Sequence, residues 1–295
     1  MPVRDVVLVL IICVVWAGNF LTSAAAMQEF PPFLFTALRL ALLAVVLVPF
    51  LRPAAPGQWP RLLTMALCNG ALHFGLSFWA LHAAGNLASP AIVMQTYVPI
   101  TALLAWLWLG EQFGPRTAAG ITLSFVGVLV LGFDPMVLER PEAVLAMLTA
   151  ACFLSVGTIL MRGLDRQDLY SVQGWTALIG LAPLLLLSAW FEPTAAAAFR
   201  SASWLSWGGV AYSALLSSLL GHGLYYQLIR RHPVTTVTPY LLLTPLLAIL
   251  LGVLFWGDQP GPRLLMGGAL VLSGVLAVAL RARARHRPVA PASDA

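Results

Sequence analysis

Two histidines and one arginine are the side chains that could do chemistry inside the long apolar stretches of this sequence. His73 and His222 each lie near the middle of such a stretch, and Arg39 lies well inside another. An imidazole titrates near neutral pH, so either histidine could carry a proton or hydrogen-bond a carboxylate. Each could equally bond a neighbouring backbone carbonyl and hold two helices together. Arg39 also has two interpretations, because its guanidinium can extend to the end of its helix or face the interior and attract an anion.

The sequence lacks the residues that catalysis, metal binding or cofactor binding would need. No Asp or Glu falls in the middle of an apolar stretch, and the three cysteines, Cys13, Cys68 and Cys152, lie inside apolar runs as small buried hydrophobes do. The sequence contains no metal-binding cluster, phosphate-binding glycine loop or nucleophile elbow. We therefore predict no catalytic residue, no metal and no cofactor, and we do not expect an enzyme.

The composition indicates which solvent the protein meets. Hydrophobic residues make up 60% of the 295 residues and charged residues only 9%, whereas about a quarter of a soluble domain is charged. The net charge of +5 comes from arginine near the ends of apolar stretches, so nucleic acid is not a predicted partner. The sequence predicts an all-α integral membrane protein in contact with lipid.

A helix needs roughly 20 mostly apolar residues to cross a bilayer. The first stretch is followed by Ala24-Ala25-Ala26, which resembles a signal-peptide cleavage site, but the stretch is long and carries Trp16 and Asn19. We interpret it as an uncleaved first helix. We predict ten transmembrane helices at 5–25, 32–51, 61–82, 88–109, 116–133, 142–162, 171–191, 204–229, 234–256 and 263–281.

Arginine predicts the orientation. If the N-terminus is cytoplasmic and the helices alternate, twelve arginines face the cytoplasm and three, Arg140, Arg200 and Arg263, face the other side. Positive residues favour the cytoplasmic side. Both termini are therefore predicted to be cytoplasmic.

An internal duplication organises the chain. The stretch Gly110–Arg116 recurs as Gly257–Arg263, and Gly120 and Gly127 recur as Gly267 and Gly274. We predict a first five-helix repeat at 1–137, a second at 138–284, and a basic, disordered cytoplasmic tail at 285–295. Because five is odd, the second repeat enters the membrane from the opposite side, an inverted repeat typical of secondary transporters.

On these features the sequence resembles the EamA family of the drug/metabolite transporter superfamily, and within it the bacterial aromatic amino acid exporter branch. The resemblance rests on the ten spans, on the Gly-Glu and Gly-Asp turns that precede a glycine-spaced helix, on Trp16-Ala17-Gly18-Asn19-Phe20 and on Arg39. It implies export of amino acids or other small metabolites. It also implies a central cavity built from helices 1, 3, 4, 6, 8 and 9, with helices 5 and 10 outside.

Polar and aromatic residues within the spans are the candidate cavity residues. Polar groups in a bilayer need partners, which inward-facing positions supply. The candidates are Trp16, Asn19, His73, Ser77, Phe78, Met94, Gln95, Tyr97, Ser155, Thr158, Ser218, His222, Tyr226, Tyr240 and Thr244. Pro99 and Pro245 interrupt corresponding helices, and such paired interruptions point to a binding site and to gating.

The function predicted from this pattern is export of small metabolites across the bacterial inner membrane. The expected substrates are amino acids, aromatic and apolar ones included, moved by alternating access and, without a buried carboxylate, by facilitated diffusion. The alternatives are a multidrug or nucleotide-sugar/phosphate transporter on the same fold, and a proton-coupled antiporter using His73 and His222. The glycine stripes of helices 5 and 10 could join helices within one chain or between two, so monomer and homodimer both stay open.

Overall fold

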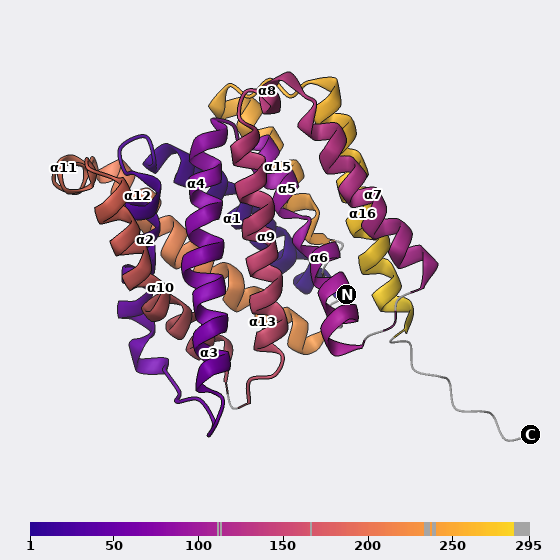
Figure 1. Ribbon diagram of the computed structural model, residues 1–295, viewed down its shortest axis with the longest axis horizontal. Helices are drawn as coiled ribbons and strands as arrows, with labels where there is room; N and C mark the ends of the chain where they lie inside the picture. Colours follow the sequence, from indigo (N-terminus) through magenta and orange to yellow (C-terminus); the bar gives the residue numbers. More distant parts are fainter. Residues whose placement is uncertain (111, 113, 166, 233–236, 238–239, 286–295) are drawn as a thin grey trace, which may run out of the picture.

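The computed structural model describes residues 1–110, 112, 114–165, 167–232, 237 and 240–285, and every regular element in them is helical (Figure 1). The first half contains α1 (Val3–Ala26), α2 (Pro32–Leu47), η1 (Val48–Phe50), α3 (Trp59–Ala66), η2 (Leu67–His73), α4 (Phe74–Ala84), α5 (Ala88–Met94), α6 (Tyr97–Leu109) and α7 (Pro115–Gly132). The second half contains α8 (Pro135–Leu138), α9 (Pro141–Met161), α10 (Leu169–Phe191), α11 (Ala195–Ser201), α12 (Trp204–Ala211), η3 (Tyr212–Gly221), α13 (His222–Arg231), α15 (Leu243–Leu251), η4 (Gly252–Trp256) and α16 (Pro262–Arg285).

Seven helices in the described residues are long and apolar enough to cross a membrane. They span Val3–Ala26, Pro32–Phe50, Trp59–Ala84, Ala88–Leu109, Pro115–Gly132, Pro141–Met161 and Leu169–Phe191. Two shorter apolar helices cover Leu243–Trp256 and Pro262–Val278, and α12, η3 and α13 run on as one helix. Within the described residues these elements overlap the predicted stretches, and ten crossings of a bilayer stay a prediction.

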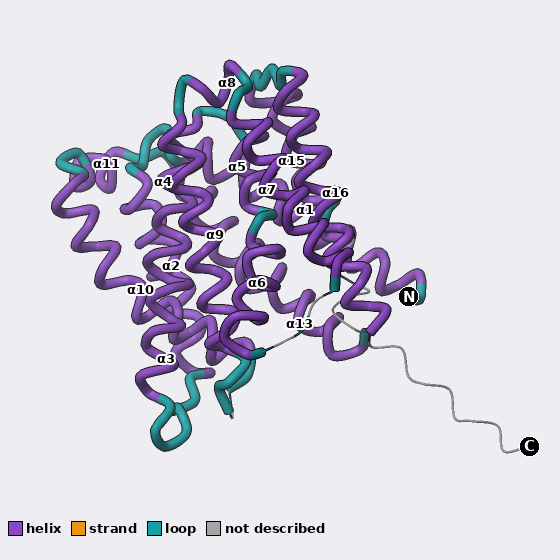
Figure 2. Tube along the Cα trace, turned by 45° about the vertical axis from the view of Figure 1, so that its right-hand side comes forward, coloured by secondary structure: helices purple, strands orange, loops and turns teal. Residues whose placement is uncertain are grey.

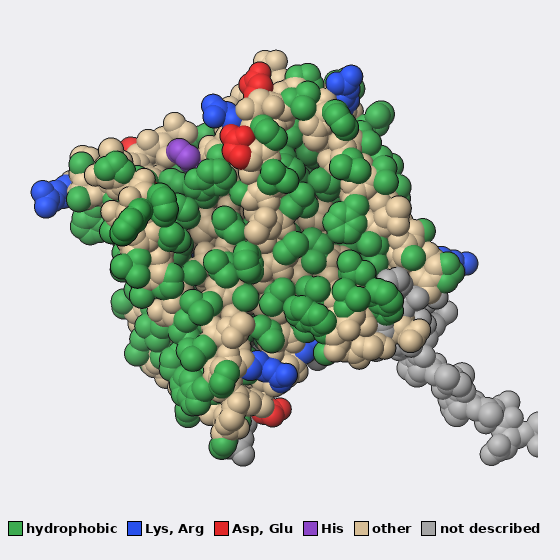
Figure 3. Space-filling model, in the orientation of Figure 1, with side chains coloured by type: hydrophobic (Ala, Val, Ile, Leu, Met, Phe, Trp, Pro, Cys, Tyr) green, Lys and Arg blue, Asp and Glu red, His purple; other side chains and the backbone are tan. Residues whose placement is uncertain are grey.

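The surface shows the same division between lipid-like and water-like regions. Figure 3 shows a broad apolar zone across the middle of one face, with acidic and basic side chains gathered at its two ends. The helices run between these ends (Figure 2). This arrangement places apolar side chains where a bilayer would contact them.

The duplicated turn starts with a glycine of the same conformation in both copies. Gly110 ends α6 with φ +65°, and Gly257 ends η4 with φ +79°, a left-handed conformation that favours glycine at a helix end. The next helix then begins at Pro115 or Pro262, where a missing backbone N–H costs nothing. The motif is thus a stop-and-start signal between two helices.

Glycines bring α7 and α16 into backbone contact. A Cβ atom at Gly127 would lie 2.7 Å from the carbonyl oxygen of Gly267, and one at Gly120 would lie 2.8 Å from that of Gly274. Because residue numbers rise along α7 while those of their partners fall along α16, the two helices are antiparallel; they lie side by side in Figure 1. The glycine stripes therefore pack on each other within the chain.

The first helix of each half packs with the other half. α1 packs on α12, η3 and α15, whereas α9 packs on α3, η2, α4, α5 and α6. We call α3, η2 and α4–α6 with α9 the first bundle, and α12, η3, α13, α15 and η4 with α1 the second bundle. The pairs α2–α10 and α7–α16 complete the fold. The two bundles therefore differ from the two sequence halves, because α1 packs in the second bundle and α9 packs in the first.

Candidate functional site

In each bundle, the helix that carries the histidine changes from α-helical to π-helical next to it. The helix at 59–84 is π-helical in η2, which ends at His73, and the helix at 204–231 is π-helical in η3, which ends just before His222. A π turn widens the helix and is frequent at functional sites. The two bundles thus carry equivalent irregular segments with a histidine at the end of each.

His73 joins two helices of the first bundle. Its Nδ1 lies 3.1 Å from the carbonyl oxygen of Ala150 on α9, and the Ser77 hydroxyl donates to the carbonyl of His73 at 2.6 Å. A carbonyl can only accept, so the hydrogen-bond network assigns the proton to Nδ1. His73 therefore makes the interhelical bond that a structural role requires, and its Nε2 remains as an acceptor.

His222 is held by Trp16 from the exchanged helix α1. The Trp16 indole donates to the carbonyl of Ser217 at 3.1 Å, and Nδ1 of His222 lies 3.1 Å from the same oxygen. The two rings are 5.1 Å apart between centroids. The predicted cavity residues Trp16 and His222 are thus neighbours in the second bundle. The side chain of Tyr226 lies outside the described residues.

Arg39 of α2 lies between the two bundles, with 1% of its surface exposed. Its Nε donates to the carbonyl of Ser213 at 3.3 Å and its Nη2 to the Ser218 hydroxyl at 2.5 Å. On the other side, its guanidinium lies 4.0 Å from the ring centroid of Phe74 and 5.2 Å from that of Phe78. Such burial is incompatible with extension to the end of the helix, so the side chain of Arg39 faces the interior of the protein.

Burying this cation is costly. Removal of an ion from water costs several kcal/mol even after relaxation, and each desolvated cation–π contact returns about 2 kcal/mol at best. Among the described residues Arg39 forms no ion pair, and its Nη1 has no hydrogen-bond partner. The site therefore has an unsatisfied donor at its centre.

These side chains form one cluster at the junction of the bundles. Arg39 packs on Phe74, whose ring centroid is 4.7 Å from that of His73. It also bonds Ser218, next to the Ser217 carbonyl that faces His222. The sequence predicted both histidines, Ser218 and Phe78 as cavity residues. It missed Phe74, whose only sequence signal is its position next to His73.

The interruptions near Pro99 and Pro245 are visible in both helices. α5 ends at Met94 and α6 begins at Tyr97, while a turn at residue 242 precedes α15. A proline has no N–H for the carbonyl four residues earlier, and at Gln95 that carbonyl accepts instead from Val98 at 3.1 Å. Movement at these points stays a prediction.

The other predicted residues are more dispersed. Ser155 on α9 donates to the carbonyl of Tyr97 at 3.0 Å, which ties α9 to the start of α6. Two residues bond within their own helices: Asn19 accepts from Ser23, and Thr158 donates to Leu154. Met94 packs on the core between α5, α7, α9 and α16, Thr244 is buried, and Tyr240 is 42% exposed.

One end of the junction is closed by contacts that the sequence did not predict. Asp258 follows the second bundle, and its carboxylate accepts from the backbone N–H groups of Leu87 and Ala88, at 2.9 and 3.1 Å, where α5 of the first bundle begins. Trp256 donates to the carbonyl of Gly85 at 3.1 Å. A carboxylate at a helix N-terminus satisfies otherwise unpaired donors. We call these contacts of Asp258 and Trp256 the end latch.

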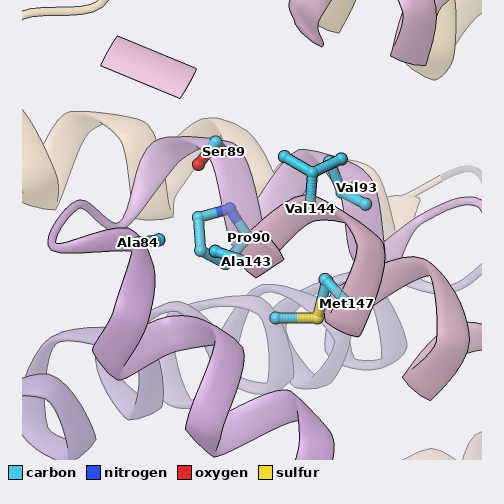
Figure 4. A pocket seen from close by; sticks show the side chains of 7 residues that line it. All are labelled: Ala84, Ser89, Pro90, Val93, Ala143, Val144 and Met147. Carbon is cyan, nitrogen blue, oxygen red and sulfur yellow. The ribbon is translucent and has the colours of Figure 1, made fainter. Parts of the chain in front are cut away.

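Small side chains let the bundles touch near the latch. Ala17, Ala91 and Ala248, from α1, α5 and α15, form a buried cluster. Figure 4 shows a separate, shallow pocket within the first bundle that is too small to hold a water molecule. Its lining is mostly apolar and consists of Ala84, Ser89, Pro90, Val93, Ala143, Val144 and Met147. This pocket is distinct from the cluster around Arg39.

Glu29 gives a testable pH dependence at a helix end. It accepts from the backbone N–H and hydroxyl of Ser203, at 2.6 and 2.8 Å, and these bonds hold its pKa below the ordinary 4.5. An acid with a lowered folded-state pKa stabilises the fold above its unfolded pKa, and that stability is lost as pH falls through the folded value. We expect the melting temperature of wild type to fall more steeply than that of Glu29→Gln between about pH 5 and 3. Glu142→Gln, at an exposed position, should keep the wild-type slope, and equal slopes in all three proteins would contradict the assignment.

Comparison with known proteins places this chain in a family. The model of the EamA-like transporter family matches residues 4–133 and 141–280. A protein of Escherichia coli (strain K12) named "Probable amino-acid metabolite efflux pump" is 26% identical, with 92% of this chain and 93% of that protein covered. Its namesake in Salmonella typhimurium is 28% identical over the same shares.

One further relative and one solved structure are also similar to this chain. A "Probable terminal-alkyne amino-acid exporter" of Streptantibioticus cattleyicolor is 25% identical, covering 76% of this chain and 75% of that protein. A solved crystal structure matches with a TM-score of 0.63 at 21% identity, covering 97% of this chain and 100% of the other, which shows a shared fold. Because the family model covers both halves, from residue 4 to residue 280, the chain belongs to the EamA-like transporter family.

Proposed function

We propose that this transporter exports small metabolites, chiefly amino acids with aromatic and apolar ones included, across the bacterial inner membrane. The observation that carries the proposal is the buried Arg39 at the junction of the two bundles, where it bonds Ser218 of the second bundle and contacts the ring of Phe74 of the first. Binding sites of secondary transporters lie at such junctions. The printed names of three relatives, which refer to amino acids or their metabolites, support the same substrate class.

The proposed topology is ten helices in two inverted repeats, 1–137 and 138–284, with a cytoplasmic tail at 285–295. The antiparallel packing of α7 on α16, their corresponding last helices, supports the inversion. The arginine distribution supports cytoplasmic termini. The tail lies outside the described residues except for Arg285. Since the glycine faces of α7 and α16 are covered within the chain, we favour a monomer over a homodimer through them.

Alternating access would occur as the two bundles tilt about the cluster. In this structure the end latch of Asp258 and Trp256 holds one end closed. Opening would break these bonds and separate Ala17 and Ala248 from Ala91. The interruptions at Pro99 and Pro245 give each bundle a point at which a helix can bend.

Facilitated diffusion is the proposed mode of transport. Within the described residues the carboxylates lie at helix ends or in the segments that connect helices, whereas carriers driven by protons commonly place one in the membrane. Nδ1 of each histidine already faces a carbonyl oxygen. Proton antiport through His73 and His222 remains the alternative, and an imposed pH gradient separates the two modes.

The other two rival cargoes fit the charge of the site less well. A multidrug carrier for organic cations would bring positive charge to the buried cation Arg39. A nucleotide-sugar or phosphate carrier needs several fixed positive charges, and the sequence has no lysine to add to it.

A thermal-stability screen tests the substrate class. A ligand that binds the folded state raises the melting temperature with its concentration, by mass action. We expect phenylalanine, tryptophan and leucine to stabilise the purified protein, whereas tetraphenylphosphonium and sugar phosphates have no effect. Stabilisation by one of the latter two alone would replace the proposal with that rival.

A further inference from the structure

Arg39 is a buried cation between the two bundles, and it has no counter-ion among the described residues. Its side chain is 1% exposed, it forms no ion pair among the described residues, and its Nη1 lacks a hydrogen-bond partner there. A buried charge is normally paired. An anion that binds from outside the chain would supply the missing partner.

The hydrogen bonds already made by the guanidinium determine which edge remains. Nε donates to the carbonyl of Ser213, and Nη2 uses one of its two protons for Ser218. Both protons of Nη1 and the second proton of Nη2 are left. The second proton of Nη2 and one proton of Nη1 form the end-on edge of the guanidinium, which matches the two oxygens of one carboxylate.

The surroundings select an anion with a single charge and an apolar body. The rings of Phe74 and Phe78 lie beside the guanidinium on one side, and no second arginine is near it among its described contacts. A phosphate dianion would remain half neutralised at such a site, whereas one carboxylate balances one guanidinium. Aromatic walls suit an apolar or aromatic side chain beside that carboxylate.

We propose that Arg39 binds the carboxylate of the transported molecule through its Nη1–Nη2 edge, so that the substrate must carry a free carboxylate. The inference rests on the proposed function and adds the chemical group that is recognised. A substrate bound to Arg39 would affect both bundles, because Arg39 contacts serines of the second bundle and phenylalanines of the first. A bound carboxylate completes the contacts of a side chain that lies between the bundles.

The test compares phenylalanine with phenylalaninamide, which lacks only the carboxylate charge, by thermal stabilisation of the purified protein. In wild type we expect the amide to bind at least about tenfold more weakly than phenylalanine, the factor that corresponds to about 1.4 kcal/mol. Arg39→Met should lose this discrimination, while Arg200→Gln, at an exposed arginine, should keep it. Arg39→Met that still prefers phenylalanine over the amide to the wild-type extent would overturn the inference.

A second readout separates ligand binding from a structural role. An unpaired buried charge is costly to remove from water, and Arg39→Met removes that cost, so the variant without ligand should melt at or above the wild-type temperature. A large decrease would assign Arg39 to structure and contradict the inference. Arg39-dependent binding of benzoate or phenylpyruvate without any amino acid would keep the carboxylate site and reject the proposed function. If wild type binds no carboxylate, both fail.

Discussion

Asp258→Ala should open the end latch and expose the alanine contact near it. The substitution leaves the backbone N–H groups of Leu87 and Ala88 without their acceptor, and an unsatisfied buried donor costs about 1–3 kcal/mol. We expect a cysteine at Ala91, which is 1% exposed, to react with a water-soluble maleimide at least about tenfold faster in this variant, since about 1.4 kcal/mol is one factor of ten.

The experiment needs a background in which Cys13, Cys68 and Cys152 are replaced by alanine. Glu142→Ala is the matched control, because Glu142 is an exposed acidic residue that starts α9 in the first bundle and forms no latch contact. Its labelling rate should equal that of the parent. A rate for Asp258→Ala that also equals the parent would show that the carboxylate does not hold the bundles together.

Gly127→Ala and Gly267→Ala should each destabilise the protein. An added Cβ at Gly127 would lie 2.6 Å from the backbone nitrogen of Val271, and one at Gly267 would lie 2.5 Å from the carbonyl oxygen of Gly127. Backbone atoms cannot rotate away, so α7 and α16 must separate. Overpacking of this kind costs about 1–3 kcal/mol and sometimes more, which a melting experiment in detergent would detect.

Gly132→Ala provides the control in the same helix. Nothing lies within 4 Å of the Cβ position at Gly132, and alanine is the better helix former by up to about 1 kcal/mol. That variant should melt at or slightly above the wild-type temperature. The double variant Gly127→Ala/Gly267→Ala should cost less than the two single changes together, because both push the same helices apart. Unchanged stability in Gly127→Ala would place the glycines away from close packing.

Periodicity and repetition predicted the helices well. The predicted stretches coincide with helices because apolar length and turn residues act locally, and Gly110 and Gly257 end their helices in both copies. The glycine stripes were correctly assigned to close packing. The sequence could not decide whether they pack on each other within one chain or on a second copy of the chain. Repetition shows that two halves are alike without showing which helices touch.

The site was predictable only in part, for the same reason. The positions of His73 and His222 within apolar stretches made them candidates, but the exchange of α1 and α9 between halves, and the π-helical segments before each histidine, follow from tertiary packing. Arg39 bonds to residues 174 and 179 positions away. Asp258 was expected to be part of a turn, and its role at α5 depends on a contact 171 residues away.

Uptake of labelled amino acids into liposomes containing the purified protein tests the account most directly. We expect saturable uptake of phenylalanine that reaches equilibrium and is not raised above it by an imposed pH gradient, with slower uptake in Asp258→Ala and Arg39→Met. Accumulation driven by the gradient would contradict facilitated diffusion and favour proton exchange through His73 and His222. Absence of uptake of any amino acid in either direction would contradict the proposed function itself.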